Sequence, residues 1–178
     1  GILLTPPVLI IVQARIGGTR FPGKVLAPLL GQPLLLWLLH RLRRVQTSHR
    51  LIVACPNDSA NQEIVRLCEQ HGYEVWAPPV PEQDVLARYQ WVAEKYDTRE
   101  IVRVCGDCPL LDPIIIDWLI AYHRRCFPAQ LMPAMIQPIP DHTGIAAQWP
   151  DGMDAEVITR HALHLAHEAA ILPHQREH

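Results

Sequence analysis

The chain has 178 residues, 49% of them hydrophobic, which is enough to bury the core of one compact domain. Its net charge of −2 excludes a protein that binds nucleic acid regardless of sequence, because such proteins need a strongly basic surface. We expect a cytoplasmic protein without a membrane segment. The apolar runs are too short to cross a bilayer, no signal segment opens the chain, and the five cysteines form no disulfide pattern.

The predicted elements alternate between strands and helices. An unbroken apolar run at 8–12, ended by Gln13, is typical of a central strand buried on both faces. A loop at 15–32 follows, and Pro33 stands where the first turn of a helix accepts a proline. In chain order, strands are expected at 8–12, 51–54, 73–76, 101–104 and 153–158, and helices at 34–45, about 59–69, 84–96, 113–125 and 159–170.

This order predicts an α/β fold with a Rossmann-like three-layer α/β/α arrangement around a mainly parallel sheet. Ligands of such sheets bind beyond the carboxyl ends of the strands. Two loops at such ends carry unusual chemistry, one after the strand at 8–12 and one after the strand at 101–104. We therefore expect the functional site to be built from these two loops.

The first loop combines three cations with a glycine-rich backbone. Arg15, Arg20 and Lys24 are side chains that can grip a polyphosphate, and the backbone N–H groups at Gly17 and Gly18 add to the cradle. The alternative is a solvated turn whose cations keep the protein soluble.

A P-loop NTPase is excluded, although the spacing of residues 18–24 matches a Walker A loop. Val25 stands where a hydroxyl group would hold magnesium. Pro28, Gly31 and Pro33 prevent the long helix that would begin at the lysine of such a loop.

The second loop places a carboxylate directly after a buried strand. Asp107 follows Gly106, and a carboxylate at this position can hold Mg²⁺ against phosphate oxygens. Asp112 is expected to cap the next helix. Cys105 and Cys108 form a Cys-x-x-Cys pair, so a thioredoxin-like redox site is an alternative for this loop.

The segment at 13–24 resembles the opening signature of the CMP-sugar cytidylyltransferases, and the segment at 106–113 looks most like the spore-coat polysaccharide type within that family. The resemblance implies a nucleotide-diphospho-sugar transferase-like fold. It also implies that the first loop wraps the triphosphate of CTP, that Gln13 and Ala14 border the cytosine, and that Asp107 binds the metal. Gly18 stands where serine is common in the family. The positions that match the opening signature of the family are Ala14, Arg15, Arg20, Pro22, Gly23, Lys24 and Leu26.

Two further segments resemble the same family. Asp84 and Arg88 match a segment near the nucleotide-sugar cleft, and an ordinary i,i+4 salt bridge is the alternative. Asp154 and Glu156 match a late acidic motif and face the same side of a predicted strand. They would contact sugar hydroxyls or help to bind metal, and a surface acidic pair is the alternative.

The resemblance implies that CMP is transferred from CTP to a sugar acid with release of pyrophosphate. Arg15, Lys24 and Asp107 would be catalytic, with Mg²⁺ as cofactor. Residues 1–178 would form a single nucleotidyltransferase domain of a homodimer. We expect this domain to be truncated at its C-terminus, because the family continues to a second metal-binding aspartate. The alternatives are a nucleotide-sugar-dependent glycosyltransferase of similar fold, a non-catalytic nucleotide-binding remnant and a thiol oxidoreductase.

Overall fold

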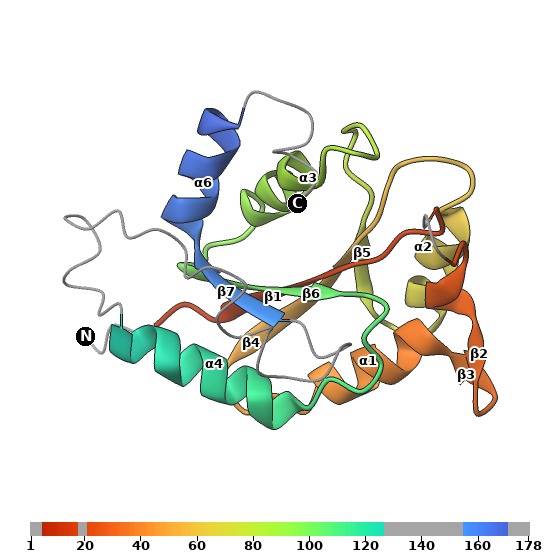
Figure 1. Cartoon of the computed structure of the whole chain (residues 1–178), viewed down its shortest axis with the longest axis horizontal. Coiled ribbons are helices and arrows are strands. Elements are labelled where there is room, and N and C mark those ends of the chain that lie inside the picture. Colours follow the sequence, from red (N-terminus) through yellow and green to blue (C-terminus); the bar gives the residue numbers. More distant parts are fainter. Residues whose placement is uncertain (1–4, 18–20, 127–154, 171–178) are drawn as a thin grey trace.

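The computed structural model describes residues 5–17, 21–126 and 155–170. Within these residues a five-stranded sheet has the strand order β5-β4-β1-β6-β7 (Figure 1). The first four strands of this order are parallel, so the predicted α/β fold with a mainly parallel sheet is confirmed. The strands are β1 (Val8–Gln13), β4 (His49–Ala54), β5 (Glu74–Trp76), β6 (Glu100–Cys105) and β7 (Ala155–Thr159).

The edge strand β7 runs antiparallel to β6, with Glu100 opposite Thr159 and Val104 opposite Ala155. An apolar pattern predicts that a strand exists but reads the same in both directions. The direction of β7 is therefore set by its pairing with β6, which the sequence pattern does not contain.

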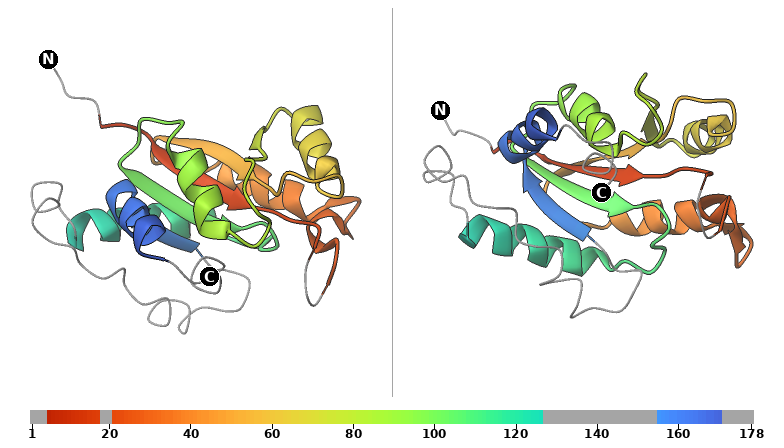
Figure 2. Two further views of the ribbon diagram at one scale, coloured as in Figure 1. Left: turned by 90° about the horizontal axis from the view of Figure 1, so that it is seen from above. Right: turned by 45° about the horizontal axis from the view of Figure 1, so that its top comes forward.

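Helices cover both faces of the sheet, as the predicted three-layer arrangement requires. Figures 1 and 2 show α1 and α4 on one face and α3 and α6 on the other. Among the described residues, no helix is both long and apolar enough to span a membrane. The helices are α1 (Leu34–Leu42), α2 (Gln62–Gln70), α3 (Val85–Ala93), α4 (Pro113–Cys126) and α6 (Arg160–Ala169).

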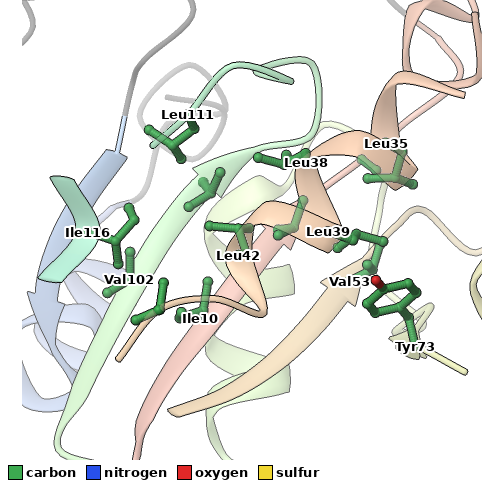
Figure 3. Close-up of a cluster of buried hydrophobic side chains, with 14 of the residues drawn as sticks. Ile10, Leu35, Leu38, Leu39, Leu42, Val53, Tyr73, Val102, Leu111 and Ile116 are labelled. Carbon is green, nitrogen blue, oxygen red and sulfur yellow. The ribbon is translucent and has the colours of Figure 1, made fainter. Parts of the chain in front are cut away.

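The central strand β1 divides the hydrophobic core into two clusters. Its alternating side chains point to opposite faces of the sheet, so Val8, Ile10 and Val12 pack with α1 and α4, whereas Leu9 and Ile11 pack with α3 and α6. All five are at most 1% exposed. Figure 3 shows the first cluster, in which the leucines of α1 lie over the sheet. This packing fixes the sheet whose carboxyl edge carries the two loops.

Local differences from the predicted elements are concentrated after β1. The predicted loop at 15–32 contains a short 3-10 helix, η1 (Lys24–Leu26), and a small hairpin of β2 (Pro28–Leu29) and β3 (Gln32–Pro33). The hairpin turns at Gly31, whose φ of 87° suits a residue without a Cβ. The helix predicted at 34–45 ends at Leu42, and the helix predicted from about 59 begins at Gln62.

Candidate active site

The two loops predicted to form the site meet at the carboxyl edge of the sheet. Their strands, β1 and β6, are neighbours, with Gln13 opposite Cys105. The N–H of Gly106 donates to the carbonyl of Gln13 at 2.7 Å. A Cβ on Gly106 would lie 2.8 Å from that carbonyl oxygen and 3.0 Å from the Cβ of Ala14. Glycine at 106 therefore permits the close approach of the loop that carries Asp107 to the loop that follows β1.

A lysine from the first loop and an aspartate from the second form an ion pair. The Nζ of Lys24 lies 3.5 Å from the Oδ2 of Asp107, and each side chain is 45% exposed. Lys24 begins η1 directly after Gly23, whose φ of 75° is left-handed and whose N–H donates to the carbonyl of Ile16 at 2.7 Å. This closed turn places an accessible cation beside an accessible carboxylate, as a site for a metal-bound phosphate requires.

The turn after β1 is also held by a residue that the sequence analysis did not select. Asn61, only 1% exposed, accepts a hydrogen bond from the N–H of Ile16 at 2.8 Å through its Oδ1. Its own N–H and its Nδ2 both donate to the Oδ1 of Asp58. Because the contact joins residues 45 positions apart, no local pattern in the sequence could have identified it.

A buried arginine lies beside the first loop. Arg88 is 1% exposed, and its Nη2 donates to the carbonyl of Glu82 at 2.6 Å, while its Nε and Nη1 have no hydrogen-bond partner. Burial lowers the pKa of the Arg88 guanidinium below its usual value, and the charge of Arg15 lowers it further. A Cβ on Gly17 would lie 2.9 Å from the Oε1 of Glu82. Glu82, which the sequence analysis also missed, thus lies between Arg88 of α3, which donates to its carbonyl, and Gly17 of the first loop.

Asp84 and Arg88, which the sequence analysis selected together, have different hydrogen-bond partners in this structure. Asp84 caps α3, because its Oδ1 accepts from the N–H of Ala87 at 3.0 Å. Arg88 bonds instead to the carbonyl of Glu82. Only Arg88 is fully buried, so the two residues occupy different environments.

The other predicted binding residues fall into two groups. Gln13 ends β1, Ala14 is buried directly after it, and Arg15 is half-buried in the first loop. Glu156 lies on β7 opposite Arg103 and forms an ion pair with it at 3.8 Å, with 18% of its side chain exposed. It is therefore a mostly buried member of the sheet. Gly18, Arg20 and Asp154 lie outside the described residues.

The sequence profile of the cytidylyltransferase family matches residues 9–178. The chain belongs to this family. It is 37% identical over 120 residues to the spore coat polysaccharide biosynthesis protein SpsF of Bacillus subtilis, covering 65% of this chain and 49% of that relative. The chain thus spans about half the length of this curated relative.

Two solved structures resemble this member of the family over nearly its whole length. A cytidylyltransferase from Leptospira borgpetersenii superposes with a TM-score of 0.78 at 26% identity, covering 97% of this chain and 68% of that one. The synthetase for CMP-2-keto-3-deoxy-manno-octonic acid, solved in complex with CTP, superposes with a TM-score of 0.68 at 17% identity, covering 96% and 82%. Because the two sequences are only 17% identical, this likeness supports the fold alone.

The described residues offer an accessible carboxylate, and no ready-made metal centre, at the carboxyl edge of the sheet. No group of three or more His, Cys, Asp or Glu residues in the described part of the chain could hold a metal ion without other ligands. Asp107 is a single accessible carboxylate, and Mg²⁺ is commonly bound by one or two carboxylates together with substrate phosphates and water. Asp107 is therefore a carboxylate that could contribute to a divalent-metal site completed by other ligands.

The two thiols of the predicted Cys-x-x-Cys pair are reduced and differ in exposure, because Cys105 is half-buried and Cys108 is buried. Cys108 is buried, and its Sγ lies 3.7 Å from the Oδ1 of Asp107, a carboxylate that disfavours a thiolate. Burial raises the pKa of Cys55 to about 11 and that of Cys68 to about 12. Reactive thiols need exposed, electropositive surroundings, so the environment of Cys108 favours the nucleotide interpretation of the second loop.

Proposed function

We propose that this cytidylyltransferase transfers CMP from CTP to a sugar acid and releases pyrophosphate, in the synthesis of a surface polysaccharide or another glycan. The observation that carries the proposal is the 3.5 Å approach of Lys24 to Asp107 at the carboxyl edge of the sheet. The proteins it resembles include one named for spore coat polysaccharide biosynthesis and one solved with CTP. Together these support CTP and a sugar acid as the substrates.

In the proposed reaction, a hydroxyl oxygen of the sugar acid attacks the α-phosphorus of CTP, forms the new P–O bond and gives up its proton to solvent water. The bond between the α-phosphorus and the bridging oxygen breaks, and that oxygen leaves with pyrophosphate. Arg15, Arg20 and Lys24 bind the β- and γ-phosphates and neutralise the charge that builds up on them. Asp107 would hold Mg²⁺, which when bound polarises the phosphate oxygens.

The remaining contacts complete the proposed site. Backbone N–H groups around Gly17 and Gly18 cradle the phosphates, while Gln13 and Ala14 border the base. The fixed charge of Arg88 strengthens the attraction for the nucleotide, and Asp84 holds the start of α3 in place. We assign the sugar acid to the edge strand β7, which carries Glu156, and Asp154 remains the second predicted sugar contact.

The assay that tests this proposal measures pyrophosphate release from CTP in the presence of a sugar acid, with and without Mg²⁺. We expect Lys24→Ala and Asp107→Ala to lower the rate by at least about 100-fold, as the loss of a charge-stabilising group does. Both variants should remain folded, because ion pairs between exposed side chains contribute only about 0–1 kcal/mol to stability. Lys95→Ala is the matched control and should keep the activity. It removes an exposed lysine whose Nζ lies over the ring of Trp91.

Other outcomes would select the alternatives. Unchanged pyrophosphate release in either site variant would refute the assigned roles. Preferential binding of UDP- or GDP-sugars over CTP would indicate a glycosyltransferase. Protection against thermal unfolding by CTP without any pyrophosphate release would indicate a non-catalytic nucleotide-binding protein.

We also propose that residues 1–178 form a single nucleotidyltransferase domain that acts in the cytoplasm as a homodimer. A cytoplasmic location agrees with the substrates, since CTP is a cytoplasmic metabolite. A homodimer is implied by the resemblance.

A further inference from the structure

A buried thiol lies against the carboxylate of the second loop. Cys108 is 3% exposed, and its Sγ donates to the Oδ1 of Asp107 at 3.7 Å. The other carboxylate oxygen, Oδ2, lies 3.5 Å from the Nζ of Lys24. A thiol is a weak donor, and an ionised carboxylate is the acceptor that strengthens such a bond most. The two oxygens of Asp107 therefore have different neighbours, a buried thiol beside Oδ1 and an accessible cation beside Oδ2.

The position of this thiol is fixed by the backbone around it. The N–H of Cys108 donates to the carbonyl of Cys105 at 3.3 Å, and the carbonyl of Cys108 accepts from the N–H of Leu111 at 3.3 Å. Leu111 is fully buried, and its carbonyl accepts from the Nε of Arg41 on α1 at 3.1 Å. The thiol thus belongs to a part of the loop that is anchored both to the core and to α1.

The carboxylate that the thiol contacts is much less enclosed. The side chain of Asp107 is 45% exposed, and exposed side chains change rotamer within nanoseconds. A metal ligand that changes rotamer freely loses this freedom when the metal binds, and the loss weakens binding. A hydrogen bond from a fixed group reduces the loss, because it holds the carboxylate in one orientation before the metal arrives.

We propose that Cys108 is a positioning residue for Asp107. Its S–H group holds Oδ1 and leaves Oδ2, the oxygen beside Lys24, available to a metal-bound phosphate. The assignment rests on the proposed function, because that function places the metal on Asp107. It also gives one cysteine of the Cys-x-x-Cys pair a role in which the thiol keeps its proton.

Infrared spectroscopy of the S–H stretching band tests the hydrogen bond in the protein without nucleotide or metal. The band of Cys108 is identified as the one that Cys108→Ala removes, and a thiol that donates absorbs at lower frequency than one that does not. Asp107→Asn replaces the ionised acceptor by a neutral amide, so we expect it to move the Cys108 band to higher frequency. A band that Asp107→Asn leaves in place overturns the proposal.

The effect on the metal is measured with Mn²⁺, whose electron paramagnetic resonance reports binding of the Mn²⁺–CTP complex. We expect Cys108→Ala to weaken this binding by about 3- to 10-fold, the size of effect that the freedom of one side chain has. Cys108→Ser, which keeps a donor on a shorter side chain, should weaken it less. Binding of CTP in the presence of a chelator, which involves no metal, should be the same in all three proteins.

Cys68→Ala is the matched control, because Cys68 is a fully buried thiol on α2. It creates a cavity of the same kind and should lower the melting temperature by a similar amount, but it should leave the affinity for Mn²⁺–CTP unchanged. Wild-type affinity in Cys108→Ala, an equal loss in Cys68→Ala, or a loss in Cys108→Ser as large as in Cys108→Ala overturns the proposal. A wild-type protein that binds no CTP contradicts the proposed function instead, and the infrared measurement still decides whether Cys108 holds Asp107.

Discussion

Arg88 is a positive charge enclosed in the protein: its guanidinium donates one hydrogen bond, to the backbone carbonyl of Glu82, and its Nε and Nη1 have no hydrogen-bond partner in the described structure. The charge of Glu82 opposes the lowering of the Arg88 pKa but does not cancel it. An uncompensated buried cation costs stability, and the lowered pKa of the guanidinium reflects this cost. The charge of Arg15 lies close enough to lower that pKa further. A nucleotide triphosphate at the first loop would supply the missing negative charge, so we interpret Arg88 as a residue that stabilises the bound state.

This interpretation makes Arg88→Met a test that separates binding from stability. The free energy of unfolding without nucleotide should stay within about 1 kcal/mol of wild type, because the lost bond to the Glu82 carbonyl is offset by the removal of a buried charge. The increase in melting temperature caused by CTP should fall by more than half. Unfolding in urea and thermal melts with and without CTP measure both quantities. Arg50→Met, on β4 and paired with Glu74, is the control and should leave the CTP effect unchanged.

At the scale of the elements, the site depends on how the segment before α2 holds the turn after β1. Asn61 is the link, because its Oδ1 accepts the hydrogen bond that the N–H of Ile16 donates at 2.8 Å. Asn61→Ala should lower the free energy of unfolding by about 1–3 kcal/mol, the cost of a buried polar group without its partner. Hydrogen exchange at the amide of Ile16 should become faster, and CTP should bind more weakly. Asn57→Ala, at an exposed position in the same loop, should change none of these.

The order of the helices and strands could be predicted because the pattern of neighbouring residues indicates each of them. The apolar run of β1 and the apolar faces of α1 and α4 fix strands and helices by their periods alone. The hairpin of β2 and β3 was missed because each strand has only two residues, too few for a period. The antiparallel direction of β7 was missed because it depends on a neighbouring strand.

The residues of the candidate site also fall into those with a local signal in the sequence and those without one. Lys24 and Asp107 could be selected because charged residues in glycine-containing loops after strands are a local signal, and the parallel order of β1 and β6 brings the two loops together. Asn61 and Glu82 could not be selected, because each acts on a residue far away in sequence. Glycine at 106 marks a turn in the sequence, but its need for space against Gln13 is visible only in three dimensions.

At the scale of the whole molecule, the stability of the fold should depend on pH through His123, which is 9% exposed on α4. Burial lowers the pKa of its imidazole below the usual value, Arg124 lowers it further and Glu100 opposes the shift. The unfolded chain therefore binds a proton more readily than the folded protein, and stability is lost as the pH falls below about 6.5. The loss is at most about 1.4 kcal/mol per pH unit and stops at the folded pKa.

Urea unfolding at several pH values between 7.5 and 5 measures this effect, in a range where Asp and Glu side chains with lowered pKa values, such as Glu74 and Asp117, stay charged. His123→Gln should reduce the slope of the unfolding free energy against pH, and the remaining slope is expected from His40. His161→Gln, at an exposed position on α6, should leave the wild-type slope unchanged. An equal slope in wild type and His123→Gln would show that another group titrates, with His40, whose pKa is also lowered by burial, as the next to test.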